Sequence, residues 1–366
     1  MSSQANLATD WRAGYGPIAH RSETIERMQA LVQRLVAQRR IADEASAHAL
    51  LAAADRVACT AMSVVAHMTY ARRIDRSGCP LGSDDFKQTP EGHTGGSLNM
   101  VPAFVGYLLA NALTGTTRGW LMGQGHCVAA IEAVNALTGD VSAAQRGRYD
   151  RSEAGLSRLI ADFYSYAIDK QGRPAVPLGS HAGPNTAGAI SEGGYLGFAG
   201  LQYVHTPLPG ESLVAFLSDG AFEEQRGSDW APRWWRAEDC GFAIPVMILN
   251  GRRIEQRTQI VQEGGATWLA EDLRHNGFDP VIVDGRDPMA IAWAIVEAED
   301  TLSAFAARSD RRYPVKLPYV IAETEKGFGF PGAATNAAHN LPLNGNPRED
   351  AQAREAFNAG AAALFV

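Results

Sequence analysis

Apolar side chains recur at helical spacing in the first part of the chain, between residues 22 and 73. Intervals of three and four positions place such residues on one face of a helix. An alanine-rich stretch from Ala42 to Ala58 follows the first of these patterns. The sequence therefore predicts two or three helices in this part. The apolar face of the first is formed by Met28, Leu31, Val32 and Leu35.

The rest of the chain alternates short apolar runs with helical patterns. Runs that are apolar on both faces and too short for helices are typical of buried parallel strands. One helical pattern extends from Asp287 to Ala307. Such alternation favours an α/β fold, with a doubly wound parallel sheet covered by helices on both faces. The predicted strands are Gly119–Met122, Leu213–Leu217, Ile244–Leu249, Pro280–Val283 and Pro318–Ala322.

The length of 366 residues and the hydrophobic content of 46% are sufficient for one large core. We expect a helical N-terminal extension in residues 1–75 and one α/β domain in residues 76–345. A C-terminal tail in residues 346–366 is expected to lead to a further domain or a partner. The segment 75–91 contains several glycines and prolines, so it is predicted to be irregular.

Charge and cysteine content narrow the class of protein. Lys and Arg total 33 against 40 Asp and Glu, for a formal net charge of −7, so no nucleic-acid partner is expected. No apolar run approaches the ~18 residues of a membrane span, and the N-terminus lacks a signal pattern. We therefore expect a cytoplasmic protein. Zinc and disulfides are not indicated, because no Cys-x-x-Cys pair occurs among Cys59, Cys79, Cys127 and Cys240.

Two polar residues that follow predicted strands have the chemistry of a metal site. Asp219 and Asn250 lie 31 positions apart (250 − 219), each just beyond an apolar run. Ligands of open α/β sheets gather at the carboxyl ends of the strands. Magnesium prefers six oxygens and usually takes one or two carboxylates plus phosphate oxygens. Asp219, Asn250 and the backbone carbonyl of Arg252 are therefore candidate ligands, although an Asp-Gly pair alone is explained equally well by a turn.

Several further motifs follow one another along the chain. The segment Gly179–Gly197 contains Ser-His181 and Glu192-Gly193-Gly194. Histidine loops precede it at Glu91–Gly96 and Gly123–His126, and another lies at Asn336–Leu343. Together with Asp219-Gly220 and Asn250, this series resembles the phosphoketolases and transketolases, which depend on thiamine diphosphate. The glycine that usually precedes the aspartate of the thiamine-diphosphate fingerprint is Ser218 in this chain.

The resemblance implies roles for the histidines of these motifs. His93 and His339 would contact substrate hydroxyls or the diphosphate, and His126 would lie beside the reacting carbon. His181 would line the same cleft. Histidine suits proton transfer because its ordinary pKa lies near neutrality, but a single histidine is more often a structural residue.

The resemblance also implies contacts to the cofactor. Glycine lets the backbone approach a phosphate closely, although packing of helix on sheet explains each glycine equally well. Glu224 matches a transketolase position in a carboxylate network near a subunit interface, whereas Glu223 is the nearer match to phosphoketolases. Either glutamate could instead stabilise a helix N-terminus. The expected cofactor-binding residues are Gly125, Glu192, Gly193, Gly194, Gly197, Asp219, Gly220, Asn250 and Lys326.

By this resemblance the cofactors are thiamine diphosphate and Mg²⁺, with Ca²⁺ as a substitute. The substrate would be a ketose phosphate of the xylulose 5-phosphate or fructose 6-phosphate type. A phosphoketolase would transfer a two-carbon unit to phosphate. Two alternatives are a split transketolase, which would transfer a ketol unit to an aldose or an unusual acceptor, and a catalytically idle regulatory paralogue.

Members of this family activate the cofactor with a glutamate from a second, pyrimidine-binding domain. This chain ends before such a domain could begin. We therefore expect a partner domain or subunit that supplies the glutamate, in a dimer or a hetero-oligomer. The chain alone is expected to bind the magnesium diphosphate weakly and to turn over no substrate.

Overall fold

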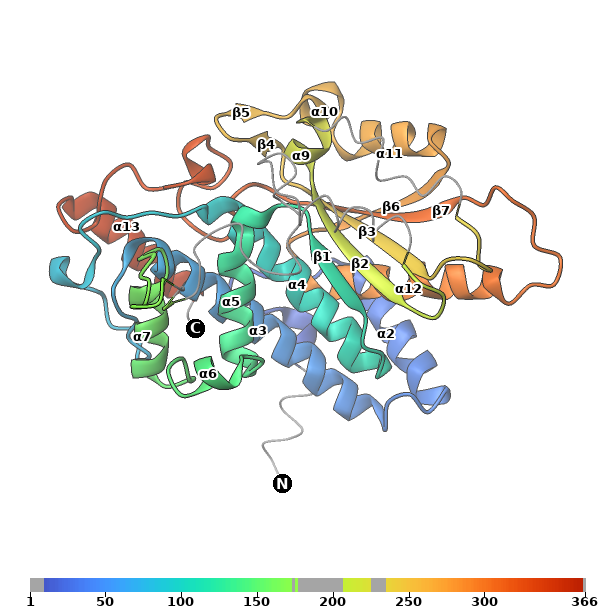
Figure 1. Cartoon of the computed structure of the whole chain (residues 1–366), viewed down its shortest axis with the longest axis horizontal. Helices are drawn as coiled ribbons and strands as arrows, with labels where there is room; N and C mark the ends of the chain where they lie inside the picture. The colour runs from blue at the N-terminus through green and yellow to red at the C-terminus, as the bar shows by residue number, and fades with distance from the viewer. Residues whose placement is uncertain (1–9, 173–174, 177–206, 225–234, 365–366) are drawn as a thin grey trace.

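The centre of the fold is a five-stranded sheet whose neighbouring strands are all parallel (Figure 1). The computed structural model describes residues 10–172, 175–176, 207–224 and 235–364. Within them the strand order is β1-β2-β3-β7-β6. All the predicted strands are confirmed, with β1 at Gly119–Met122, β2 at Ser212–Ser218, β3 at Phe242–Leu249, β6 at Phe278–Asp284 and β7 at Leu317–Glu323. A separate antiparallel hairpin joins β4 (Arg252–Arg253) to β5 (Gln256–Arg257).

Alternate residues of the central strands belong to two hydrophobic cores, one on each face of the sheet. Val214 and Phe216 of β2 contribute to one core, whereas Leu213 and Leu217 contribute to the other. Burial on both faces explains why the strands are apolar without alternation. In Figure 1, α10 (Gln259–Glu263) and α11 (Ala266–His275) lie on one side of the sheet. The other side is covered by α2 (Ser22–Ala37), α3 (Glu44–Tyr70), α4 (Thr94–Thr114) and α12 (Pro288–Ala306).

In the described residues 22–73, the predicted helices are α2 and α3, and both contribute to the same core as α4 and the sheet. The division of the chain at residues 75 and 345 stays a prediction. The remaining described helices are α5 (Val128–Thr138), α6 (Ala143–Arg146), α7 (Glu153–Asp162), α9 (Asp219–Glu224) and α13 (Ala351–Leu364). Short 3₁₀ helices occur at Asp10–Ala13, Ser83–Asp85, Gly125–Cys127 and Ala337–His339.

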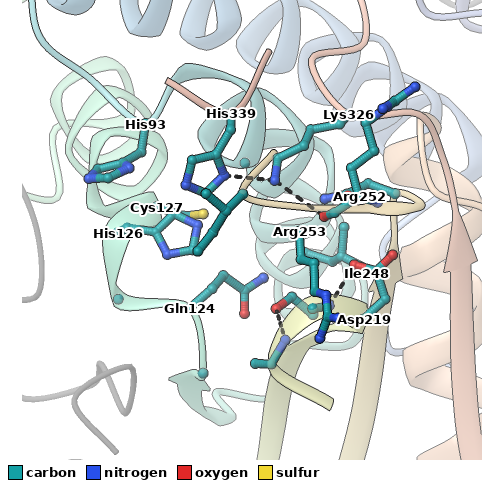
Figure 2. Close-up of a pocket in the computed structure, with 18 residues that line it drawn as sticks. His93, Gln124, His126, Cys127, Asp219, Ile248, Arg252, Arg253, Lys326 and His339 are labelled. Atoms are coloured by element: carbon teal, nitrogen blue, oxygen red, sulfur yellow. Dashed lines mark hydrogen bonds between the residues drawn. The ribbon is translucent and has the colours of Figure 1, made fainter. Parts of the chain in front are cut away.

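The carboxyl ends of four strands lead into polar residues at one edge of the sheet (Figure 2). Strand β1 is followed by Gln124 and His126, β2 by Asp219, β3 by Asn250, and β7 by Lys326. Because all these strands are parallel, their carboxyl ends lie on the same side. This is where open α/β sheets bind ligands.

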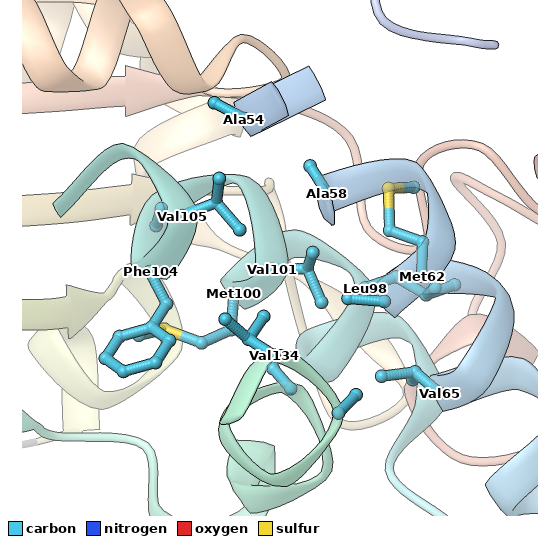
Figure 3. Close-up of a cluster of buried hydrophobic side chains, with 14 of the residues drawn as sticks. Ala54, Ala58, Met62, Val65, Leu98, Met100, Val101, Phe104, Val105 and Val134 are labelled. Atoms are coloured by element: carbon cyan, nitrogen blue, oxygen red, sulfur yellow. The ribbon is translucent and has the colours of Figure 1, made fainter. Parts of the chain in front are cut away.

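Helices α3 and α4 pack closely through small and branched side chains (Figure 3). Ala54 and Ala58 of α3 lie in this cluster with Val101 and Val105 of α4. By length and composition alone both helices could span a membrane, but 67% and 83% of the residues in their most apolar windows are buried within the fold. Buried core helices can have the same length and apolar composition as membrane spans, so the composition of α3 and α4 is only weak evidence for a membrane.

The first turns of α4 hold two loops that come from the other end of the chain. The Thr94 hydroxyl donates to the Asn340 carbonyl at 2.7 Å. The Asn99 amide donates to the Glu325 carbonyl at 2.8 Å, and its oxygen accepts from the Gly327 N–H at 3.3 Å. A methyl group on Gly95 would collide with the Ala338 carbonyl, so only glycine fits at this contact. Helix α4 therefore fixes the positions of the loops that contain Lys326 and His339.

A buried charge cluster joins the N-terminal segment to α3 and α12. His20 Nε2 lies 3.0 Å from Asp55 Oδ2, and His20 Nδ1 lies 3.0 Å from Asp287 Oδ2. The side chains of His20 and Asp287 have no exposed surface. Burial opposes the charged form of His20, but hydrogen bonds to Asp287 and Asp55 outweigh it and raise its pKa to about 10. Asp287 also accepts from the Met289 N–H at 2.8 Å and so caps α12.

Replacing His20 with leucine should leave two buried carboxylates without their cation. We expect the free energy of unfolding near neutral pH to fall by about 3 kcal/mol, the usual cost of breaking a buried ion pair. Because the pKa is higher in the folded protein than the ordinary 6.5, this contribution is complete below about 6.5 and is lost as the pH rises toward about 10. Urea unfolding of wild type and His20→Leu should therefore differ less at high pH. The exposed His275→Gln variant is the control, and a pH-independent difference would contradict the assignment.

The variant Gly95→Ala should displace the loop that contains His339, because the added methyl group meets the Ala338 carbonyl. Overpacking of this kind costs about 1–3 kcal/mol. We expect lower stability in urea and faster hydrogen exchange in residues 334–343. The matched control is Gly147→Ala, where a methyl group meets nothing within 4 Å. Unchanged exchange in Gly95→Ala would show that α4 does not hold this loop.

Candidate functional site

A cavity of about 190 Å³ lies at the carboxyl ends of the strands (Figure 2). Its walls come from the segment after β1, the ends of β2 and β3, the start of α9, the β4 hairpin, the start of α4 and the two loops after β7. These segments are far apart in the sequence, and the parallel sheet brings them together. The predicted site residues in its lining are His93, Gly125, His126, Asp219, Gly220, Asn250, Arg252, Lys326 and His339.

Asp219 begins α9 directly after β2 and is completely buried. Its Oδ1 accepts from the Gly220 N–H at 3.0 Å, and its Oδ2 accepts from the Gly251 N–H at 2.6 Å. Burial raises the pKa of Asp219 to about 7, although these hydrogen bonds oppose the change. Oδ2 also accepts from the Thr258 hydroxyl at 3.4 Å, so the second lone pair of Oδ1 is the one left for a cation in the cavity.

The other two predicted metal ligands lie beside Asp219 in the same cavity. Asn250 Oδ1 accepts from the Arg252 N–H at 3.1 Å, and the Arg252 carbonyl accepts from Lys326 Nζ at 3.2 Å. Among the described residues, no three His, Cys, Asp or Glu side chains cluster as metal ligands. One carboxylate, one amide and one carbonyl form a different kind of set, which fits a magnesium ion whose remaining ligands are phosphate oxygens and water.

Three histidines meet on the opposite wall of the cavity (Figure 2). His93 precedes α4, His126 lies in the 3₁₀ helix after β1, and His339 ends the 3₁₀ helix Ala337–His339. The ring centroids of His93 and His126 are 5.2 Å apart, and His339 lies 5.6 Å from each. Burial, followed by the charges of Lys326 and His93, lowers the pKa of His339 to about 4. His339 is therefore neutral at physiological pH.

A second, more open cavity of about 380 Å³ adjoins the first, and the two share Ile254 and His339 in their linings. The polar residues Glu255, Asn336 and Asn340 line this outer cavity. An elongated polar molecule could therefore reach past His339 from the outer cavity toward Asp219.

Basic side chains give the inner cavity a positive wall. Arg252, Arg253 and Lys326 all line it. Arg253 lies 3.8 Å from Glu223, whose Oε1 accepts from the Ile260 N–H at 2.8 Å. Glu223 thus holds the β4 hairpin against the following helix. Arg257 is exposed on β5 and does not line the cavity.

The structure adds residues that the sequence did not single out. Gln124 is buried in the lining, and its Oε1 has no hydrogen-bond partner among the described residues. Ile254 lies at the turn of the β4–β5 hairpin, where its side chain is 56% exposed and its backbone has a positive φ of 35°. Asn99 lies outside the lining but positions the loop of Lys326. Only Gln124 had a sequence signal, because it lies inside the Gly123–His126 motif.

These features fit a magnesium diphosphate. The positive wall suits the diphosphate anion, and the buried Asp219 together with the neutral oxygen of Asn250 suits the cation. Gly220 has an additional packing role, because a methyl group there would lie 2.9 Å from the Arg253 Cβ.

Glu224 ends α9, and its side chain lies outside the described part of the structure. The predicted residues His181, Glu192, Gly193, Gly194 and Gly197 lie entirely outside the described residues.

Solved structures with a similar arrangement include transketolases. A transketolase mutant from Pichia stipitis aligns with 85% of this chain and 44% of its own, at a TM-score of 0.46 and 16% identity. A transketolase from Leishmania mexicana aligns with 84% of this chain and 44% of its own, at a TM-score of 0.44 and 15% identity.

Sequence comparison gives a more specific result. A probable phosphoketolase of Streptomyces coelicolor is 32% identical over 228 residues, which cover 55% of this chain and 27% of the relative. A probable phosphoketolase of Mycolicibacterium paratuberculosis is 28% identical over 302 residues, 75% of this chain and 36% of the relative. The chain thus spans about a third of the length of these curated relatives. The family model described as the XFP N-terminal domain matches residues 46–358. The chain therefore belongs to the thiamine-diphosphate-dependent phosphoketolase family and corresponds to its N-terminal domain.

Proposed function

We propose that this chain is the diphosphate- and magnesium-binding part of a phosphoketolase-like enzyme. The enzyme would cleave a ketose phosphate of the xylulose 5-phosphate or fructose 6-phosphate type and transfer a two-carbon unit. One observation carries the proposal: a single cavity combines Asp219, Asn250 and Lys326 with three histidines at the carboxyl ends of parallel strands. Membership of the phosphoketolase family favours this reaction.

Within this proposal, each side of the cavity has its own task. Asp219, Asn250 and the Arg252 carbonyl would bind the magnesium ion, and Arg253 and Lys326 would balance the diphosphate charge. Thiamine diphosphate, when bound, supplies the electron sink for cleavage beside a ketone. The histidines would form hydrogen bonds to the oxygens of the sugar, with His126 nearest to the reacting carbon. His181, Glu192, Gly193, Gly194, Gly197 and Glu224 are proposed to complete the cofactor and substrate contacts.

A partner completes the proposed enzyme. The chain spans about a third of the length of its curated relatives, and we propose that a pyrimidine-binding domain or subunit supplies the activating glutamate. We propose a dimer or hetero-oligomer that works in the cytoplasm. Transfer to an aldose, as in transketolases, is the alternative outcome, because the described residues do not discriminate between acceptors.

The variant Asp219→Ala should abolish magnesium-dependent binding of thiamine diphosphate, because it removes the one carboxylate among the three protein ligands and leaves only two neutral oxygens. Isothermal titration of the assembled enzyme, with and without Mg²⁺, measures this directly. Asp310→Ala, which removes an exposed carboxylate, is the control. Binding to Asp219→Ala that still depends on Mg²⁺ would refute the metal assignment.

Turnover should require a pyrimidine-binding domain in addition to these 366 residues, and the experiment adds it as a second polypeptide. We expect no product from this chain with thiamine diphosphate, Mg²⁺ and xylulose 5-phosphate. Addition of the second polypeptide should yield acetyl phosphate when inorganic phosphate is the acceptor. A new ketose formed with an aldose acceptor would instead favour the transketolase alternative. Robust turnover by the chain alone would exclude the need for a partner, and no product with any acceptor would favour the idle paralogue.

A further inference from the structure

A hydrogen bond inside the cavity joins two of the predicted site residues. Lys326 Nζ lies 2.8 Å from His339 Nδ1 and 3.2 Å from the Arg252 carbonyl oxygen (Figure 2). Lys326 is 3% exposed, so few water molecules compete for its hydrogens. The ammonium therefore lies between a backbone carbonyl and one edge of an imidazole ring.

With Lys326 in its ammonium form, the chemistry of the groups determines the direction of both hydrogen bonds. A carbonyl oxygen only accepts, and a lysine ammonium has three donors and no acceptor. Lys326 therefore donates to Arg252 and to His339, and His339 Nδ1 must offer its lone pair. In a neutral imidazole one nitrogen accepts and the other bears the proton. The proton of His339 is consequently on Nε2.

Both partners are held in place from outside the hydrogen bond. Asn99 binds the backbone on each side of Lys326, at Glu325 and Gly327. The Ala334 N–H donates to the Lys326 carbonyl at 2.8 Å. Thr94 holds the Asn340 carbonyl next to His339. The packing of α4 therefore fixes the backbone positions of both residues, and these positions bring their side chains into contact.

The groups around the two residues are consistent with a neutral ring next to a charged amine. Lys326 and His93 both lower the pKa of His339, after burial as the main cause. Burial lowers the pKa of Lys326, and the nearby Asp219 offsets only part of this decrease. Among the described residues, two further titratable groups line the cavity near this pair: His126, whose ring centroid is 5.6 Å from that of His339, and the buried Cys127.

We propose that Lys326 is a positioning residue that fixes His339 as the tautomer with its proton on Nε2, so that His339 acts as a hydrogen-bond donor. Nδ1 and Nε2 lie on different edges of the ring, and the ring turns Nδ1 toward Lys326 (Figure 2). His339 then recognises an acceptor oxygen and does not serve as a general base. The tautomer is a property of this chain, whereas its use on a sugar or phosphate oxygen rests on the proposed function.

Nitrogen NMR of the full chain with ¹⁵N-labelled histidine tests the tautomer. We expect His339 Nδ1 to show the chemical shift of an unprotonated nitrogen and Nε2 that of a protonated one throughout the neutral pH range. Signals that vanish in His339→Gln identify the residue. Lys326→Met, which removes the donor and keeps the length of the side chain, should lose the single-tautomer signature. The exposed Lys316→Met variant is the matched control and should leave the signature unchanged.

Two results would overturn the proposal. One is a wild-type His339 with the proton on Nδ1, and this result does not depend on whether any variant folds. The other is a Lys326→Met variant that is folded and has an unchanged His339 spectrum.

A pair of variants in the assembled enzyme tests how the donor is used. The amide nitrogen of glutamine reaches the place of the histidine Nε2, whereas that of asparagine reaches the place of Nδ1. We expect His339→Gln to keep a kcat at least about tenfold higher than His339→Asn, which is the size of one hydrogen bond. Equal losses would exclude the donor role. If the wild-type enzyme has no turnover, the proposed function fails and the NMR result still decides the tautomer.

Discussion

Helix α4 begins at the cavity and packs against both loops that complete it. Its first turns contact residue 338 through Gly95 and residues 325–327 through Asn99. Farther along, Gly106 lies against Pro288 and Ile291 of α12, where a side chain would not fit. The helix is thus anchored in the core and, at the same time, determines where Lys326 and His339 lie. A shift of α4 would change the core and the cavity together.

The cavity concentrates polar groups where burial disfavours their charges. Asp219 is fully buried and Lys326 nearly so. Burial raises the pKa of Asp219 and lowers the pKa of Lys326, which favours the neutral form of each. Hydrogen bonds from the Gly251 and Gly220 amides stabilise the carboxylate. The surrounding core, in which α3 and α4 pack closely, offsets the remaining cost. Such a local cost is common where a protein prepares a site for a charged ligand.

Much of the fold was predictable from local patterns. The central strands β2, β3 and β7 are covered on both faces and are therefore apolar, and this property can be read from short segments such as residues 213–217 and 244–249. The order of the strands in the sheet cannot be read from short segments of the sequence. Strand β7 inserts between β3 and β6, and the sequence contains no pattern for pairings between segments so far apart. The burial of α2 and α3 in the common core likewise depends on non-local contacts.

The sequence alone determined the parallel α/β class, the strand ends at Asp219 and Asn250, and the motifs that contain His93, His126 and His339. It could do so because these features depend on residue type and short-range spacing. Only the tertiary structure decided that Lys326 donates to His339, that Asn99 holds the loop of Lys326, and that His20 lies between Asp55 and Asp287. The direction of a hydrogen bond and the charge of a buried group depend on neighbours that folding brings together, and most of these neighbours are distant in the sequence.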